Sequence, residues 1–336
     1  MIISRTPFRI SFFGGGTDYP AWYLKEGGSV LSTTIDRYCY ITCRYMPPFF
    51  RELKHRIVWR HVETVLSLDD ILHPAVREGL RYLGFDDSAG LEIHYQGDLP
   101  ARSGMGSSSS FAVGLIKALT ALRGQMISKH DLALKAIELE QNVLKENVGS
   151  QDQVAVAYGG LNVIRFHQNG QILVEPVTIP QSRKSDLQSR LLLFYTGTSR
   201  FASNIAADVI ANMSGKREIL RQMHSYVDEA LSVLCGTDSL DDFGRLLHET
   251  WMLKKQQSEL VTNSLVDSIY QAAMTNGAIG GKLLGAGSSG FMLFYVPPEK
   301  QPTVIQALSD YLHVPFKFDN EGCTLIHYGN DNIKDA

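Results

Sequence analysis

The segment from Asp98 to Ala121 constrains this chain more than any other part of the sequence. Residues 91–95 alternate apolar and polar side chains as a half-buried strand does, and a glycine- and serine-rich turn follows them. A helix is predicted beyond the turn, because apolar residues recur there at helical spacing: Phe111, Leu115, Ile116, Leu119 and Leu122. The first amides of a helix have no partner within it and the helix dipole favours anions, so such a unit can hold a phosphate group. This segment alone leaves open the alternative of a polar linker before a well-capped helix.

Size and charge limit the classes of protein to which the chain can belong. At 336 residues it is long enough for two domains, since a single core stops growing at roughly 250–300 residues. The 32 basic and 35 acidic side chains leave a net charge of only -3, which indicates neither a nucleic-acid-binding nor a membrane-binding surface. A small anionic ligand would therefore have to be held by local groups.

The cysteines and the hydropathy pattern favour a cytoplasmic protein. Four cysteines are too few for a disulfide scaffold at this length, and the close pair Cys39 and Cys43 has no second pair to complete a zinc site. We expect both to be reduced core residues. The N-terminus lacks a sustained apolar stretch, and no later run approaches about 18 apolar residues, so no membrane partner is expected.

Strands and helices are mixed in both halves of the chain, which predicts an α+β fold of two domains. Helices are predicted at residues 74–83, 129–146, 152–158, 203–213, 217–234, 240–255, 264–276 and 302–312. Ser128 is expected to cap the helix that begins at residue 129. Residues 181–190 are polar and turn-prone, and we place the boundary between domains 1–182 and 190–330 there.

Two familiar nucleotide-binding folds are excluded by the glycine motifs. Residues 285–290 read G-A-G-S-S-G and match the dinucleotide fingerprint, but a strand rather than a helix follows them and too little chain remains for the rest of a doubly wound sheet. No G-x-x-x-x-G-K-[ST] loop occurs anywhere in the chain. Three glycine-rich loops remain, at residues 14–16, 104–106 and 285–290, and together they indicate parts of one cleft.

In order and content these loops resemble the signature motifs of the GHMP small-molecule kinases. Residues 100–109, P-A-R-S-G-M-G-S-S-S, resemble the family loop P-x-x-x-G-L-G-S-S-A, and residues 282–290 resemble its C-terminal glycine motif. Residues 7–19, P-F-R-I-S-F-F-G-G-G-T-D-Y, are similar to the sugar-kinase motif P-G-R-x-N-x-I-G-E-H-T-D-Y. Here Gly15 and Gly16 replace the glutamate and histidine of that motif.

The resemblance implies a fold and a nucleotide site. The fold is the two-domain GHMP kinase fold, with an N-terminal half like domain 2 of ribosomal protein S5 and a ferredoxin-like C-terminal half. ATP with Mg²⁺ is expected in the cleft between the halves. The implied nucleotide-binding residues are Pro100, Arg102, Gly104, Met105, Gly106, Ser107, Ser108 and Ser109.

The resemblance also implies the catalytic and metal-binding groups. Asp152 matches the aspartate that faces the acceptor hydroxyl in galactokinases and can accept its proton, and Arg9 matches the cation that stabilises charge on the γ-phosphoryl group. Ser108, or Ser107, and Glu140 are the implied magnesium ligands, since Mg²⁺ prefers hard oxygen donors. The alternatives are an exposed helix charge for Glu140 and a helix N-cap for Asp152.

The substrate is expected to be a small sugar or sugar phosphate. Asp18 matches the aspartate that binds ring hydroxyls, and the implied substrate-binding set is Gly15, Gly16, Thr17, Asp18, Arg200, Gly285, Gly287 and Ser288. A phosphate on the substrate would need cationic or amide donors, for which the candidates are Arg102, Ser199, Arg200 and Lys282. Each of these could equally be an ordinary surface residue.

The Gly-Gly-Gly-Thr-Asp variant looks most like the branch of the family that includes heptose 7-phosphate kinases and L-fucokinase domains. We therefore expect an ATP-dependent kinase acting on the anomeric hydroxyl of D-glycero-D-manno-heptose 7-phosphate. The alternatives are a C1 kinase of an unphosphorylated sugar, such as fucose or galactose, and a non-catalytic regulator that binds nucleotide or sugar. The oligomeric state is left open, a homodimer being one option.

Overall fold

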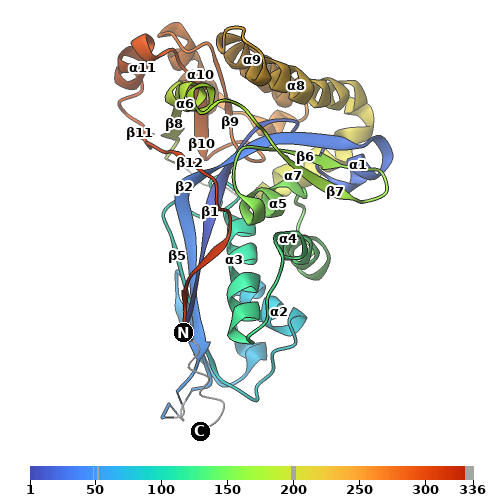
Figure 1. Cartoon of the computed structure of the whole chain (residues 1–336), viewed down its shortest axis with the longest axis vertical. Coiled ribbons are helices and arrows are strands. Elements are labelled where there is room, and N and C mark those ends of the chain that lie inside the picture. Colours follow the sequence, from blue (N-terminus) through green and yellow to red (C-terminus); the bar gives the residue numbers. More distant parts are fainter. Residues whose placement is uncertain (48, 51–52, 198–201, 330–336) are drawn as a thin grey trace.

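The computed structural model describes residues 1–47, 49–50, 53–197 and 202–329. Two sheets, each with its own helices, lie one above the other along the longest axis of the molecule (Figure 1). The larger sheet has the order β13-β1-β2-β5-β3-β4, and β6, β7 and β12 join it beside β2. The smaller sheet has the order β11-β8-β10-β9. The predicted mixture of strands and helices in both halves is confirmed.

The larger sheet is built on one long hairpin. Strands β1 (Ile2–Phe13) and β2 (Gly28–Tyr45) pair antiparallel along most of their length, and Arg9 lies opposite Thr34. Strand β2 runs unbroken through both of the strand-like sequence runs 29–34 and 38–44. The remaining strands of this sheet are β3 (His55–Val58), β4 (Val62–Val65), β5 (Leu91–Gly97), β6 (Asn162–Phe166), β7 (Ile172–Pro176), β12 (Phe318–Asp319) and β13 (Thr324–Tyr328).

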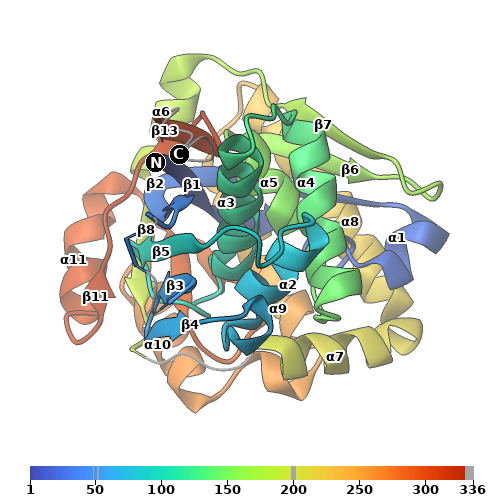
Figure 2. The same ribbon diagram turned by 90° about the horizontal axis from the view of Figure 1, so that it is seen from below.

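Helices cover one face of this sheet, as the view from below shows (Figure 2). They are α2 (Pro74–Tyr82), α3 (Ser107–Leu122), α4 (Lys129–Glu138) and α5 (Gln151–Tyr158), while α1 (Pro20–Glu26) follows the first glycine loop. Helix α3 is buried nearly all round and not on one stripe, because it lies between the sheet and helices α4 and α5. Gly114 permits this close packing, since a Cβ there would lie 2.8 Å from Thr6 Oγ1.

The helix predicted over residues 129–146 is shorter than expected. Ser128 caps its start as predicted, with its hydroxyl accepting from the Asp131 amide. The α-helix ends at Glu138, and a single π-helical turn follows over Leu139–Val143. Such wide turns are frequent at functional sites. This one carries Glu140, which turns inward and is fully buried.

The second unit contains strands β8 (Leu191–Tyr195), β9 (Gly280–Leu283), β10 (Phe291–Tyr295) and β11 (Leu312–His313). Its helices are α7 (Ala202–Asn212), α8 (Arg217–Cys235), α9 (Asp241–Lys255), α10 (Ser264–Thr275) and α11 (Gln301–Ala307). Helix α9 packs backbone to backbone on β9, because a Cβ on Gly280 would lie 1.9 Å from the Gly244 carbonyl oxygen. This contact fixes where the C-terminal end of α9 lies.

The region of the predicted boundary differs from expectation in two ways. Residues 181–190, predicted as a polar linker, contain helix α6 (Gln181–Ser189). Its sequence has no apolar period, but Leu187 is buried and the Arg183 guanidinium donates to carbonyls at the end of α8. In addition, β12 and β13 return to the first sheet and pair with β2 and β1. The last residues of the predicted domain 190–330 thus belong to the first sheet.

Two further sequence predictions concern the cysteines and the hydropathy of the helices. Cys39 and Cys43 are buried and form no disulfide, as expected for reduced core residues, whereas Cys235 is exposed. Among the described helices, none combines the length and the apolar character needed to cross a bilayer.

Candidate active site

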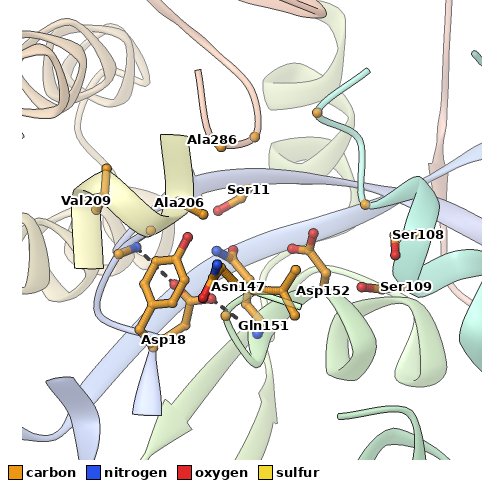
Figure 3. A pocket seen from close by; sticks show the side chains of 18 of the residues that line it. Ser11, Asp18, Ser108, Ser109, Asn147, Gln151, Asp152, Ala206, Val209 and Ala286 are labelled. Atoms are coloured by element: carbon orange, nitrogen blue, oxygen red, sulfur yellow. Dashed lines mark hydrogen bonds between the residues drawn. The ribbon is translucent and has the colours of Figure 1, made fainter. Parts of the chain in front are cut away.

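The three glycine-rich loops meet around one cavity of about 420 Å³ (Figure 3). The second and third loops touch backbone to backbone. A Cβ on Gly104 would lie 2.4 Å from the Leu284 carbonyl oxygen, and one on Gly285 would lie 2.4 Å from Gly104 Cα. Both positions require glycine for this reason, and both have positive φ. The predicted shared cleft is therefore present.

The serine loop leaves the start of α3 open toward the cavity. Its N-cap is Gly106, in the left-handed conformation at φ 74°, so no side chain occupies the first amides of the helix. Ser107, Ser108 and Ser109 line the cavity, and Figure 3 shows the last two at one end of it. This is the arrangement in which a helix start binds phosphate oxygens.

Two predicted nucleotide-binding residues shape this loop and do not reach the cavity. Met105 is fully buried in the core, and its carbonyl accepts from the Arg9 amide at 3.1 Å. Pro100 is exposed and lies outside the cavity lining. Arg102 does line the cavity, and its backbone amide donates to Ser107 Oγ at 3.0 Å. Pro100 and Met105 thus lie outside the cavity lining and shape the loop conformation, and a direct role of either in nucleotide binding stays a prediction.

Arg9 and Asp152 form a bidentate ion pair at the middle of the cavity. Arg9 Nε donates to Asp152 Oδ1 and Nη2 to Oδ2, both at 2.6 Å, while Nη1 donates to the Gly104 carbonyl at 2.6 Å. Arg9 is only 4% exposed. Asp152 lies at the start of α5, but the N-cap is Ser150, so the carboxylate is oriented by Arg9 and does not cap the helix. Figure 3 places Asp152 between Asp18 and the two serines.

Asp18 is held at the opposite end of the cavity by backbone amides. Its Oδ1 accepts from the Gly16 amide at 2.9 Å, and its Oδ2 from the Gln151 amide at 3.4 Å. Burial raises the pKa of Asp18, and the Asp152 charge adds to that rise. Gly149 must be glycine here, because a Cβ would lie 1.8 Å from Asp18 Oδ2. Asp18 is thus rigidly placed against the cavity.

The Thr17 hydroxyl has a structural role instead of the predicted substrate contact. Its Oγ1 donates to the carbonyl of Gly14 at 2.7 Å and accepts from the Ser29 amide at 3.2 Å. The residue is fully buried and does not line the cavity. Thr17 therefore closes the first glycine loop onto β2.

Glu140 lies directly behind the serines. Its Oε1 accepts from Ser108 Oγ, and its Oε2 accepts from Ser109 Oγ at 2.7 Å and from Gln153 Nε2 at 2.6 Å. Burial raises the pKa of Glu140 to about 7, although these hydrogen bonds oppose the rise. The alternative of an exposed helix charge is excluded by this burial. Glu146, which sequence reasoning did not single out, lines the cavity beside Ser108.

Two lysines from the second unit also line the cavity. Lys254, at the end of α9, donates from Nζ to the Leu283 carbonyl at 3.0 Å and to the Gly285 carbonyl. Lys282, on β9, donates to the Phe12 carbonyl at 2.8 Å. Lys282 is one of the phosphate candidates predicted from the sequence. Lys254 was not predicted, because a lysine near a helix end is usually an exposed dipole partner.

The remaining predicted substrate residues fall into two groups. Gly15, Gly16 and Gly285 line the cavity, whereas Gly287 and Ser288 pack on the Val261 backbone outside it. The last two need correction, since the third loop turns away from the cavity after Ala286. Among the phosphate candidates, Ser199 and Arg200 lie outside the described residues.

Further cavity-lining residues had no sequence signal. Ser11 and Gln151 each carry a buried polar side-chain atom, Ser11 Oγ and Gln151 Oε1, that has no hydrogen-bond partner in the described structure. Met223 comes from α8, and Gln257 comes from the turn that follows α9. Only the folded chain brings these residues to the same place.

Comparison with known proteins agrees with this geometry. Models of the GHMP kinase N-terminal and C-terminal domains match residues 70–160 and 230–314. A D-glycero-alpha-D-manno-heptose 7-phosphate kinase of Campylobacter jejuni is 30% identical, with 96% of this chain and 97% of that protein covered. A bifunctional fucokinase/GDP-fucose pyrophosphorylase of Arabidopsis thaliana is 25% identical over 94% of this chain and 32% of its own length. The crystal structure of a D-glycero-D-manno-heptose 1-phosphate kinase from Bacteroides thetaiotaomicron has a TM-score of 0.79 at 24% identity, covering 97% of this chain and 99% of that chain.

Proposed function

Because the chain belongs to the GHMP kinases, a family of ATP-dependent phosphotransferases, we propose that it phosphorylates the anomeric hydroxyl of D-glycero-D-manno-heptose 7-phosphate. The product would be the 1,7-bisphosphate. The observation that best supports kinase chemistry is the Arg9–Asp152 pair, which faces the open start of α3 across one cavity.

Asp152 is the proposed catalytic carboxylate. It lies between Asp18, which would bind sugar hydroxyls, and the serine loop, which would bind the triphosphate (Figure 3). A hydroxyl placed beside it can lose its proton to the carboxylate as it attacks the γ-phosphorus. Arg9 would keep the carboxylate oriented and add positive charge to the transferring group.

The residues behind the serine loop fit a magnesium ion. Ser108 Oγ, the Glu140 carboxylate and the neighbouring Glu146 are hard oxygen donors, and Mg²⁺ usually takes few ligands from the protein. A cation there would also offset the burial that raises the pKa of Glu140 to about 7. When bound, the ion would neutralise charge on the phosphate oxygens.

The space at Gly15 supports a substrate larger than a hexose. Gly14 and Gly16 have positive φ, but Gly15 does not, and a Cβ on Gly15 would come no closer than 3.8 Å to any side chain. Its neighbours there are Ser11 Oγ and Gln151 Nε2. Backbone geometry does not require glycine at position 15, so its role is to leave room in the cavity. An extended, hydroxylated sugar chain would fill that room.

A matched pair of substrates tests the proposal. Steady-state turnover with ATP and Mg²⁺ would be measured for D-glycero-D-manno-heptose 7-phosphate, the same heptose without phosphate, L-fucose and D-galactose. We expect kcat/KM to be highest for the phosphorylated heptose. A strong preference for an unphosphorylated sugar would replace the proposed substrate with the fucokinase- or galactokinase-like alternative. Absence of turnover, with ATP still bound, would favour the non-catalytic regulator.

A further inference from the structure

Lys254 and Lys282 are two buried ammonium groups that the proposed mechanism does not use. Lys254 is 8% exposed and Lys282 3%, and both line the cavity. All their hydrogen bonds go to backbone carbonyls, those of Leu283, Gly285 and Phe12. In the part of the chain that the structure describes, neither lysine forms an ion pair with a carboxylate.

The contrast with Arg9 shows why this arrangement is unusual. The Arg9 guanidinium is equally buried, but Asp152 neutralises it through two hydrogen bonds. A buried charge without a counter-charge is costly, and proteins retain one mainly where a ligand supplies the missing partner. The nearest acid to act on Lys282 is Asp18, which is already bound by backbone amides.

Burial and neighbouring cations disfavour the charged form of both lysines. Burial lowers the pKa of Lys254 to about 7, and the charge of Arg9 adds to the effect. Burial also holds the pKa of Lys282 well below its usual range, together with the charges of Lys254 and Arg9. An anion bound between them would restore protonation of both.

The position of the pair is fixed by the fold. The Gly244–Gly280 contact packs the start of α9 against β9, and at the other end of the helix Lys254 reaches the carbonyls at the start of the third glycine loop. Lys282 extends from β9 to β1 in the first sheet. Both amines thus lie where the second unit faces Arg9, beside the contact between Gly104 and Gly285.

We propose that Lys254 and Lys282 form a phosphate-binding site on the wall of the cavity that the second unit supplies, beside the contact between Gly104 and Gly285. Two sources of phosphate have this chemistry: the phosphate that the sugar substrate already carries, and the phosphoryl group in transfer. The assignment of the source rests on the proposed function, whereas the existence of an anion site does not.

The test uses the full-length protein with three variants. Lys254→Met removes the charge, and Lys254→Gln removes the charge but keeps an amide that can donate to the two carbonyls. Lys255→Met is the control, because Lys255 is the next residue, pairs with Asp267 at 3.6 Å and does not line the cavity. Thermal unfolding of each variant shows that it is folded before kinetics are measured.

The kinetic result identifies the source of the phosphate. If the site binds the phosphate of the sugar, both Lys254 variants raise KM for heptose 7-phosphate by about 10- to 100-fold and leave the constants for the unphosphorylated heptose unchanged. If it binds the group in transfer, kcat falls by a similar factor for both sugars. Lys255→Met behaves as wild type in either case.

The proposal is overturned if Lys254→Met retains wild-type constants with both sugars, or if Lys254→Gln restores them, since the lysine would then only hold the loop.

A binding measurement separates this failure from failure of the proposed function. Calorimetric titration of inorganic phosphate into protein saturated with ADP and Mg²⁺ needs no turnover and leaves the position of the transferred group open to phosphate. We expect binding to wild type and to Lys255→Met, and at least about 10-fold weaker binding to Lys254→Met. Equal binding to all three proteins would also overturn it.

Discussion

The two walls of the cavity carry opposite chemistry. The wall from the first unit carries three carboxylates, Asp18, Asp152 and Glu146, with Glu140 buried behind the serine loop. Its two cations are Arg9, which is paired with Asp152, and Arg102. On the wall from the second unit, the charged residues that the structure describes are both lysines, Lys254 and Lys282. Carboxylates can hold a metal ion and accept a proton, and amines can hold an anion. The division teaches that each unit supplies half of what phosphoryl transfer needs.

The two walls also differ in how their charges are satisfied. The carboxylates accept hydrogen bonds from amides, hydroxyls or Arg9, so their charges have partners within the protein itself. Within the described residues the two lysines donate hydrogen bonds to backbone carbonyls and form no ion pair, and Lys254 also lies over the Trp251 ring. Substitutions on the first wall should therefore affect the chemical step. Substitutions on the second wall should affect the charge of the cavity and the binding of phosphate.

The largest effect is expected from Asp152→Asn on the first wall. The amide cannot accept the proton of the attacking hydroxyl, so kcat should fall by about 1,000-fold, within the range for a lost general base. ATP binding, measured by equilibrium titration, should be nearly unchanged because the serine loop is intact. Wild-type turnover in this variant would remove Asp152 from the mechanism.

Glu140→Gln is expected to weaken the metal site. The apparent Mg²⁺ affinity, taken from the dependence of turnover on Mg²⁺ concentration, should fall by about 100-fold, since loss of even an outer partner costs 10- to 100-fold. Glu138→Gln is the matched control, because Glu138 is exposed and bonds only to the Asn142 amide. If the two variants need the same Mg²⁺ concentration, Glu140 is not a ligand.

Gly15→Glu tests the space between the two walls. The added side chain would occupy room next to Ser11 and Gln151, so kcat/KM for heptose 7-phosphate should fall by roughly 30-fold more than kcat/KM for a hexose. Gly15→Ala adds a Cβ that meets nothing closer than 3.8 Å and should fold normally. Equal losses for both sugars would argue against a role of Gly15 in substrate size.

The smallest effect concerns the pH dependence of stability on the second wall. The pKa of Lys254 is about 7 in the folded chain against its ordinary value of 10.5, so the unfolded chain binds more protons between these limits. The free energy of unfolding should therefore rise with pH in this window, by about 2 kcal/mol between pH 7 and pH 9. Urea unfolding at both pH values should show this rise in wild type and Lys255→Met, and a smaller one in Lys254→Met. Identical slopes would mean that Lys254 is protonated normally.

Local sequence patterns predicted the parts of the site that lie on a single loop or helix start. The serine loop was identified because glycine spacing and a following helix are visible in the sequence, whereas Arg9, Asp18 and Asp152 were implied by the resemblance to GHMP kinase motifs. The helix α6 was missed, since Leu187 and Arg183 stabilise it through contacts with the rest of the fold and not through its own periodicity. The π-helical turn that places Glu140 behind Ser108 and Ser109 was missed as well.

The sequence by itself determined the class of fold, the three glycine loops and the phosphate cradle, because backbone conformation and helix polarity are local properties. Only the tertiary structure decided which charges face the cavity. Lys254 and Lys282 line the cavity because α9 packs on β9 through two glycines, and Thr17, Met105 and Ser288 are turned away from the cavity by contacts with distant segments. Burial and pairing of a charge depend on residues far away along the chain, which no local pattern specifies.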